Sequence, residues 1–428
     1  MCGITGDTIM NTDSTIAAKL ANLNISERSE PGISRLKIET PLDEEGDPSI
    51  IAYEYKLPDG KKLVDKRRIS ILNSLAVPPA WTDVWLCIDE KGHIQATGKD
   101  AKGRLQYRYH PDWNAIKADI KFANVDDFAM MLPRLRDRVK ADLNLSGMPL
   151  EKSVALVIKL MDLYHIRIGS DEYAKQNESY GLTTLQEGHI KIIKGKKAEG
   201  KIDAIFDFIG KSGKHWKILI EDDDLAILIE ESGKVGGKDK TQDLFRYENA
   251  DGADFDVKAE HINNYIEDAL DGTRYTAKEF RTWSASWKTG ARLALITTAS
   301  ENLISNIPKL TDDALSTNSK EDGEVIIRWR GRVLRRPEGL AKLAANGKLL
   351  GKTEPERLAT MLAVIDTVAG DLGNTRAVCR TSYIRPMLME DWLSGRFEKR
   401  WQQASDLKPI PGLNRDESTV VHYMRKNE

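Results

Sequence analysis

The segment AIFDFIGKSGKHWKILI (residues 204–220) contains two runs of apolar residues on either side of a short basic turn. Apolar and polar residues alternate within these runs, which is typical of β-strands with one buried face, and Gly210–Lys214 supplies the turn of a hairpin. The preceding segment GHIKII (188–193) alternates in the same way. We therefore expect strands and a hairpin at this point in the chain.

Helical patterns surround this hairpin. Thr276 and Glu279 have the spacing of a capping box, which predicts the start of a helix that carries Arg281. Further helices are expected in four segments, the first of which carries apolar residues at helical spacing. These segments are 153–166, 225–231, 257–270 and 355–372. From about residue 110 onward the chain is thus expected to be mainly helical, with a surface loop over 311–324.

Residues 34–109 favour short strands and turns instead. KLPDGKK (56–62) carries a hairpin signal, and VWLCIDEKGHIQATG (84–98) indicates two strands around Asp89–Gly92. The polar N-terminal segment is expected to form an extension with one short helix near 16–23. We predict an α+β protein with three parts: an extension (1–32), a small, mostly β domain (33–109) and a larger, mainly helical domain (110–428).

Composition excludes several classes of protein. The 428 residues include 40% hydrophobic and 30% charged residues, an ordinary balance for a globular chain, and no apolar run approaches the ~18–20 residues that span a bilayer. The N-terminus lacks the basic start and apolar core of a secretory signal. Cys2, Cys87 and Cys379 are odd in number, far apart and without the paired spacing of a zinc site. These features predict a cytoplasmic protein.

Charge is segregated along the chain although its net value is only −2. Residues 101–220 hold 21 basic and 15 acidic residues, whereas 221–270 hold 5 basic and 15 acidic ones. Residues 326–352 hold 8 basic residues and a single acidic one, Glu338. A polyanion responds to the local field, so this distribution is compatible with a DNA-binding face, although charge runs are usually solvated surface.

Four segments carry side chains suited to phosphate chemistry. They are HIRIGSDEYAKQNESYGLTTL (165–185), FIGKSGKHWKI (208–218), KEFRTW (278–283) and LGNTRAVCRTSYIRP (372–386), and together they supply Arg167, Lys211, Arg281, Asn374 and Tyr383. Each has an ordinary structural explanation when taken alone, such as a packed arginine or a flexible basic turn. The GKSGK turn is not a Walker A site, because Ile205 stands where the first glycine would be.

In this order and with these flanks, the set resembles the type IB DNA topoisomerases of the bacterial and poxvirus kind. The resemblance covers roughly residues 33–395 and includes the block PPAWTDVWLCIDEKGHIQATGKDAKGRLQYRYHPDW (78–113). It implies a β-rich, DNA-clamping N-terminal domain and a catalytic domain of the tyrosine-recombinase-like fold. The segment at about 284–354, which contains RWRGRVLRR (328–336), is longer than the family pattern and is expected to be an insertion.

The resemblance also implies roles for the five residues. Tyr383 would attack the phosphorus, Arg167 and Arg281 would bind the non-bridging oxygens, and Lys211 would protonate the leaving 5′-oxygen. Asn374 would donate a further hydrogen bond where many relatives carry histidine; it cannot transfer a proton. No nucleotide cofactor or metal is expected. Duplex DNA is the implied partner of a nucleoid-associated monomer.

Four further residues are expected to contact DNA by the same resemblance: Gln106, Tyr107, Tyr109 and Tyr173. The alternative is that one of Tyr107 and Tyr109 faces the core of the small domain. The arginines and Trp329 of the 328–336 stretch could also contact the DNA backbone, although a solvated basic loop is the simpler interpretation.

Three other functions compete with this interpretation. A tyrosine recombinase would use similar chemistry, but the motif at 278–283 lacks the histidine that recombinases place near this arginine. A non-catalytic DNA-binding protein of the same fold would have a broken constellation, whereas all five positions are chemically competent. The start MCGITG resembles class II glutamine amidotransferases through Cys2, but nothing downstream supports that similarity.

Overall fold

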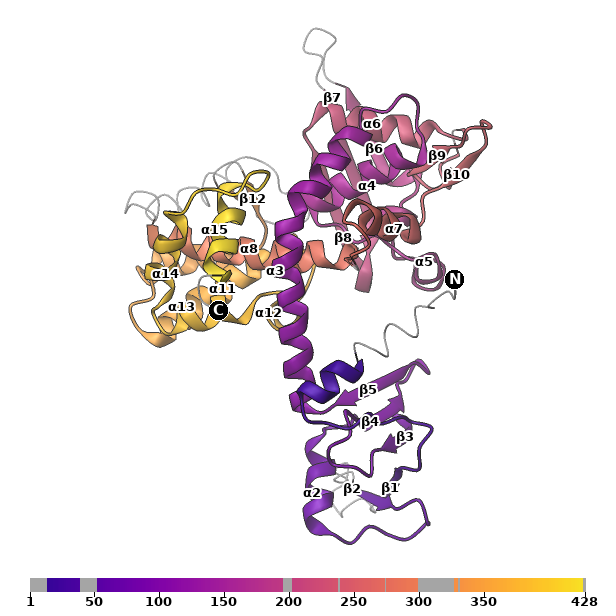
Figure 1. The fold of residues 1–428 in the computed structure, drawn as a ribbon, viewed down its shortest axis with the longest axis vertical. Helices are drawn as coiled ribbons and strands as arrows, with labels where there is room; N and C mark the ends of the chain where they lie inside the picture. The colour runs from indigo at the N-terminus through magenta and orange to yellow at the C-terminus, as the bar shows by residue number, and fades with distance from the viewer. Residues whose placement is uncertain are drawn as a thin grey trace, which may run out of the picture. The chain divides into compact units, whose positions relative to one another are not determined.

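The computed structural model describes residues 14–38, 52–194, 202–237, 239–273, 275–298, 327–329 and 332–425. It divides into two compact units, Met1–Ala123 and Asn124–Glu428, which are described separately (Figure 1). Helix α3 (Pro111–Asp142) begins in the first unit and ends in the second. Among the described residues, no helix combines the length and apolar character that a bilayer-spanning segment needs.

The first unit is built on a five-stranded antiparallel sheet (Figure 1). The predicted strand pair around Asp89–Gly92 is confirmed and forms two central neighbours of this sheet. In spatial order the strands are β2 (Ala52–Lys56), β1 (Ile33–Ile38), β3 (Thr82–Leu86), β4 (Ile94–Lys99) and β5 (Leu105–Tyr109). Strand β5 therefore lies at one edge, where only one of its sides is paired within this sheet.

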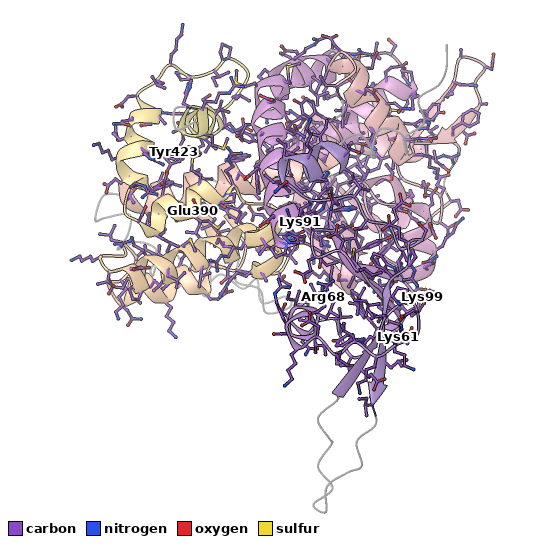
Figure 2. All side chains as sticks on the ribbon, turned by 60° about the horizontal axis from the view of Figure 1, so that its bottom comes forward. Lys61, Arg68, Lys91, Lys99, Glu390 and Tyr423 are labelled. Atoms are coloured by element: carbon purple, nitrogen blue, oxygen red, sulfur yellow. The ribbon has the colours of Figure 1, made fainter. Side chains whose placement is uncertain are left out.

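A helix in this unit, α2 (Lys66–Ser74), was missing from the prediction. Asp65 caps it by accepting hydrogen bonds from the backbone N–H groups of Arg67 and Arg68. Leu72 of α2 packs with the sheet in a small apolar cluster. The guanidinium of Arg68, a residue labelled in Figure 2, is buried and donates to the Cys87 carbonyl oxygen at 2.5 Å, which ties the helix to the sheet.

The described part of the N-terminal extension packs on the same unit. A helix over residues 14–20 confirms the short helix predicted near 16–23, and its Ala17 and Ala18 pack with Trp113. Downstream, Asn24 forms an isolated bridge with Gly92, and the Ser26 hydroxyl donates to the Ile94 carbonyl at 3.1 Å. The extension thus packs against the start of α3 and shares hydrogen bonds with the sheet and its β3–β4 turn.

The second unit contains the predicted hairpin. Strands β7 (Ile202–Gly210) and β8 (Lys214–Ile220) pair antiparallel, with Gly210 opposite Lys214, and β6 (Ile190–Lys194) adds a third strand. Alternate residues of the hairpin are buried, as the sequence pattern predicts. Helices α4 (Leu150–Tyr164) and α6 (Asp223–Lys234) confirm two of the predicted helices, and their buried residues belong to the same core as those of the sheet.

The rest of the second unit is mainly helical. The predicted capping box is present, because the Thr276 N–H donates to a Glu279 carboxylate oxygen at 2.7 Å. The segments predicted over 257–270 and 355–372 are helices α7 and α11. The helices are α5 (Asp171–Asn177), α7 (Ala259–Ala269), α8 (Ala277–Thr298), α10 (Glu338–Ala345), α11 (Glu354–Asp371), α12 (Arg376–Ser382), α13 (Pro386–Leu393), α14 (Phe397–Ser405) and α15 (Arg415–Arg425).

Two short antiparallel strand pairs complete the unit: β9 (Arg246–Glu248) with β10 (Asp254–Asp256), and β11 (Ile327–Trp329) with β12 (Arg332–Leu334). At the C-terminal end, Tyr423, which is labelled in Figure 2, packs with Phe397 and Trp401 and donates to Asp391 at 2.6 Å. The mixed helix and sheet architecture is confirmed. The loop predicted over 311–324 lies outside the described residues, as does most of the segment at 284–354 upstream of β11.

Candidate active site

Tyr383 stands at the C-terminal end of α12, a helix that begins after the loop carrying Asn374. Its backbone N–H donates to Cys379, one helical turn earlier, at 3.1 Å. The Ser286 hydroxyl of α8 donates to the Tyr383 carbonyl at 3.2 Å and accepts from the Arg385 N–H at 3.0 Å. The backbone of the tyrosine is therefore held by two helices, and its side chain is half-buried.

Arg281, in the second turn of α8, is 5% exposed and lies beside this tyrosine. Its guanidinium donates to the backbone carbonyls of His165 and Leu372, the second at 2.6 Å. Its central carbon lies 5.5 Å from the centroid of the Tyr383 ring. Burial and the positive charge of Arg167 lower the pKa of Arg281 to about 10, so the guanidinium remains charged at neutral pH.

Arg167 connects the tyrosine to Asn374. Its Nη2 donates to Asn374 Oδ1 at 2.6 Å. Since an arginine can only donate, this contact fixes the orientation of the amide and leaves Asn374 Nδ2 as the remaining donor. Asn374 is buried, and within the described residues neither its Nδ2 nor the Nε of Arg281 has a hydrogen-bond partner. Among the described residues these two buried donors therefore lack an acceptor, as donors at a site for an anionic ligand would.

The two arginines change the acidity of Tyr383. Burial alone would raise the pKa of its phenol, but the positive charges of Arg281 and Arg167, together with hydrogen bonds from both guanidiniums, lower the pKa below its usual value. A lowered pKa makes the phenolate, the nucleophilic form, easier to reach. The structure therefore brings together four of the five predicted residues, with the phenol in a positively charged environment.

The fifth predicted residue, Lys211, lies apart from this group. It is exposed at the tip of the β7–β8 hairpin, where its ammonium stands 5.9 Å from the centroid of the Tyr173 ring. In the described chain no hydrogen bond or ion pair joins it to the other four. Lys214, at the other end of the same turn, instead reaches the loop before α12, and its Nζ donates to the Gly373 carbonyl at 3.0 Å.

Sequence reasoning did not select Lys214, although the GKSGK turn contains both lysines. Burial, followed by the positive charges of Arg336 and Arg167, lowers the pKa of Lys214. Arg336 was also missed, because it was grouped with a basic stretch expected to be solvated. Its Nη1 donates to the Asn374 carbonyl at 2.9 Å.

A buried ion cluster lies next to the site. Asp371, the last residue of α11, accepts from Lys288 and Arg292 of α8 at 2.6 Å each. Burial would raise the pKa of Asp371, but these two cations dominate and hold it well below its usual value. The carbonyl of the next residue, Leu372, accepts a hydrogen bond from Arg281. The cluster therefore joins α8 to the end of α11 directly beside the site.

The predicted DNA contacts of the first unit gather on edge strand β5. Tyr107 and Tyr109 are 41% and 37% exposed and stack on one another, with ring centroids 5.8 Å apart. The alternative in which one tyrosine faces the core is wrong, because residues two apart on a strand share a face. Gln106 is partly buried, and its amide donates to Asp100 at 3.0 Å.

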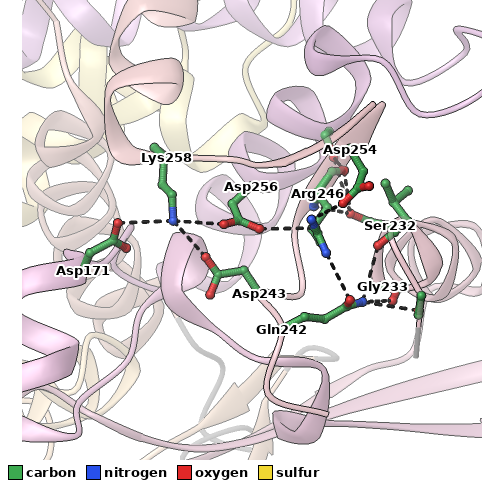
Figure 3. Close-up of polar contacts among 12 residues, drawn as sticks. Asp171, Ser232, Gly233, Gln242, Asp243, Arg246, Asp254, Asp256 and Lys258 are labelled. Atoms are coloured by element: carbon green, nitrogen blue, oxygen red, sulfur yellow. Dashed lines mark hydrogen bonds and ion pairs between the residues drawn. The ribbon is translucent and has the colours of Figure 1, made fainter. Parts of the chain in front are cut away.

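Tyr173 lies on α5 in the second unit, where an ion network holds that helix (Figure 3). The Lys258 ammonium contacts the carboxylates of Asp171, the first residue of α5, at 3.2 Å and Asp243 at 3.0 Å. Asp256 extends the network to Arg246. Tyr173 follows Asp171 by two residues on this helix, and its ring centroid lies 5.9 Å from the Lys211 ammonium.

Comparisons with known proteins agree with this chemistry. Residues 112–394 match the family described as "Eukaryotic DNA topoisomerase I, catalytic core", and residues 52–100 match "Bacterial DNA topoisomerase IB, N-terminal domain". The chain is 31% identical over 234 residues to DNA topoisomerase 1B of Acanthamoeba polyphaga mimivirus, covering 55% of this chain and 67% of the viral protein. It is 27% identical over 170 residues to DNA topoisomerase 1B of Vaccinia virus (strain Copenhagen), covering 37% of this chain and about half, 52%, of that protein.

Proposed function

Because the chain belongs to the type IB DNA topoisomerase family, we propose that it relaxes supercoiled duplex DNA by cleaving and resealing one strand through Tyr383. The observation that carries this proposal is the convergence of Arg167, Arg281 and Asn374 beside a phenol whose pKa is lowered. Several fixed donors beside one nucleophile match the needs of a phosphate whose charge grows during the reaction.

The reaction exchanges one ester for another. The Tyr383 phenol releases its proton to water, and its oxygen forms a bond to the phosphorus while the bond from phosphorus to the 5′-oxygen breaks. The products are a 3′-phosphotyrosine and a 5′-hydroxyl, whose oxygen receives a proton from Lys211. Because the phosphotyrosine retains the energy of the phosphodiester, attack by the 5′-hydroxyl reseals the strand and no ATP is consumed.

The charged side chains act on the transition state. The guanidiniums of Arg167 and Arg281 donate to the non-bridging oxygens, and Asn374 Nδ2 adds a neutral donor. Asn374 Nδ2 and Arg281 Nε, which have no hydrogen-bond partner among the described residues, support these roles because a phosphate oxygen could accept from them. Each preorganised donor of this kind typically contributes ~2.7–4 kcal/mol to transition-state stabilisation. With this much fixed positive charge the chemistry needs no metal ion.

The remaining assignments follow from the same reaction. The exposed position of Lys211 on the hairpin tip supports a role as general acid that reaches the leaving oxygen when DNA is bound. In this proposal the duplex is contacted by Gln106, Tyr107, Tyr109 and Tyr173. The β-rich domain comprises residues 33–109, and the catalytic domain comprises residues 110–428. The catalytic domain has the tyrosine-recombinase-like arrangement, and the protein works as a monomer on nucleoid DNA.

Plasmid relaxation with a chelator present and ATP absent tests the proposal. The wild-type protein should relax supercoiled plasmid, and denaturant should trap a covalent protein–DNA adduct. Tyr383→Phe should abolish both while retaining duplex binding. Tyr275→Phe is the matched control, since Tyr275 is also half-buried in the same unit and its hydroxyl has no hydrogen bond in the described chain. Relaxation by Tyr383→Phe, or strand exchange without relaxation by the wild type, would contradict the proposal.

A further inference from the structure

Two basic residues outside the proposed catalytic set hold the backbone of the loop that carries Asn374. Gly373 and Asn374 are the middle residues of the connection 372–375 that joins α11 to α12. Lys214 of β8 donates to the carbonyl of Gly373 at 3.0 Å, and Arg336 donates to the carbonyl of Asn374 at 2.9 Å. Two successive carbonyls thus each accept a hydrogen bond from a cationic side chain, and the two side chains come from different parts of the chain.

Packing reinforces these hydrogen bonds. Gly373 has a φ of +61°, and a Cβ placed there would lie 2.0 Å from the Trp216 ring, so the loop backbone rests directly on β8. The guanidinium of Arg335 covers the same indole, with its central carbon 5.0 Å from the ring centroid. The loop, the hairpin and the segment after β12 therefore meet at one junction.

The conformation of Arg336 is itself unusual. It has a φ of +53°, in the left-handed region that residues with a side chain rarely occupy. Such a conformation persists only where the surroundings determine it, and it is found preferentially at functional sites. Here it accompanies the turn that presents Arg335 to Trp216 and Arg336 to the Asn374 carbonyl.

We propose that Arg336 and Lys214 are positioning residues for DNA cleavage, which fix the Gly373–Asn374 loop and thereby place both the Asn374 amide and the start of the helix that ends at Tyr383. This inference rests on the proposed function. It also gives a role to the far end of the segment at 284–354, whose last described strand, β12, leads directly into Arg335 and Arg336. Neither side chain needs to touch the reacting atoms, because each acts through a carbonyl of the loop.

The first test measures single-turnover cleavage separately from DNA affinity. For Arg336→Gln we expect the cleavage rate to fall on the order of 10-fold to 100-fold, the loss that a small misplacement of catalytic groups produces, while duplex affinity stays nearly unchanged. Arg336→Lys, which keeps a charge and one donor, should recover part of the rate. A weakened duplex affinity with an unchanged cleavage rate would overturn the inference, because Arg336 would then act as a DNA contact.

Arg357→Gln is the matched control. Arg357 also donates to a backbone carbonyl in this unit, that of Leu393 at 2.8 Å, but it touches no residue of the site. Circular dichroism first verifies that both variants are folded. Arg357→Gln should then cleave at the wild-type rate. Equal loss in the two variants would mean a general structural effect and would refute the positioning role.

The second test is a double-mutant cycle. If Arg336 acts through the loop, Arg336→Gln should slow cleavage much less in an Asn374→Ala background than in the wild type. Lys214→Gln should behave in the same way. Fully additive effects would refute the inference. If the wild-type protein forms no covalent adduct, the proposed function fails; if it forms one and both variants cleave at the wild-type rate, only this inference fails.

Discussion

Replacing Asp371 with asparagine should expose how strongly the buried ion cluster beneath the active site stabilises the second unit. The Asp371 side chain is 8% exposed and is shared by Lys288 and Arg292, which are themselves 13% and 7% exposed. Asparagine keeps the shape of the side chain but removes its charge. Two largely buried cations would then lose the carboxylate that they share.

The magnitude follows from this burial. Removing one partner of a buried ion pair typically lowers the free energy of unfolding by ~3–5 kcal/mol, because an uncompensated charge is left inside the protein. Asp366→Asn is the matched control, since Asp366 lies on the same helix and pairs with Arg376 near the surface, where the side chains are 22% and 49% exposed. Exposed pairs contribute only ~0.2–1 kcal/mol.

The free energy of unfolding of both variants can be measured by urea denaturation followed by circular dichroism. We expect a clear loss of stability for Asp371→Asn and little change for Asp366→Asn. Because the pKa of Asp371 is held below its usual value, its contribution is present above about pH 4, the pKa in the unfolded chain, and is lost as the pH falls through the lower folded-state value. The difference in the free energy of unfolding between the wild type and Asp371→Asn should therefore be constant around neutral pH and become smaller in acid. Equal losses for the two variants would refute this reasoning.

Two further predictions concern the chemistry of the site. Arg167→Gln removes one of the charges that lower the pKa of Tyr383, so the rise of the cleavage rate with pH should move to higher pH; an unmoved profile would contradict the proposed activation of the phenol. Asn374→Ala should slow single-turnover cleavage by ~10²–10³-fold, as loss of a transition-state donor does, and Asn374→His should recover activity with a new ionisation near pH 6.5. Wild-type cleavage by Asn374→Ala would show that the buried amide binds no phosphate oxygen.

The sequence predicts the parts of this fold that depend on local patterns. The alternation in 204–220 and the apolar spacing in 153–166 correctly indicate the hairpin and helix α4, because burial of one face imposes those periods. The capping pair Thr276 and Glu279 likewise marks the start of α8. Helix α2 was missed although Asp65 is a good N-cap, because its surroundings were interpreted as strands and turns.

The supporting contacts of the site could not be predicted in the same way. Arg281, Lys214 and Arg336 all bind backbone carbonyls that are far away in the chain. A carbonyl is present at every residue, so the sequence contains no signal for which one accepts a given arginine or lysine. The motifs therefore indicate the residues that act on the substrate, whereas the residues that hold the loop emerge only from the tertiary structure.

The choice of acceptors separates the cations of the site from the structural cations. Lys288, Arg292 and Lys258 are neutralised by carboxylates. In contrast, Arg167 binds the amide oxygen of Asn374, and Arg281, Lys214 and Arg336 bind carbonyls; within the described ranges no carboxylate pairs with any of these four. Neutral acceptors orient a cation without cancelling its charge, so the repulsion among these groups is left for an incoming anion to relieve. A phosphodiester, which supplies that anion, would thus bind most favourably at the point where Tyr383 can attack it.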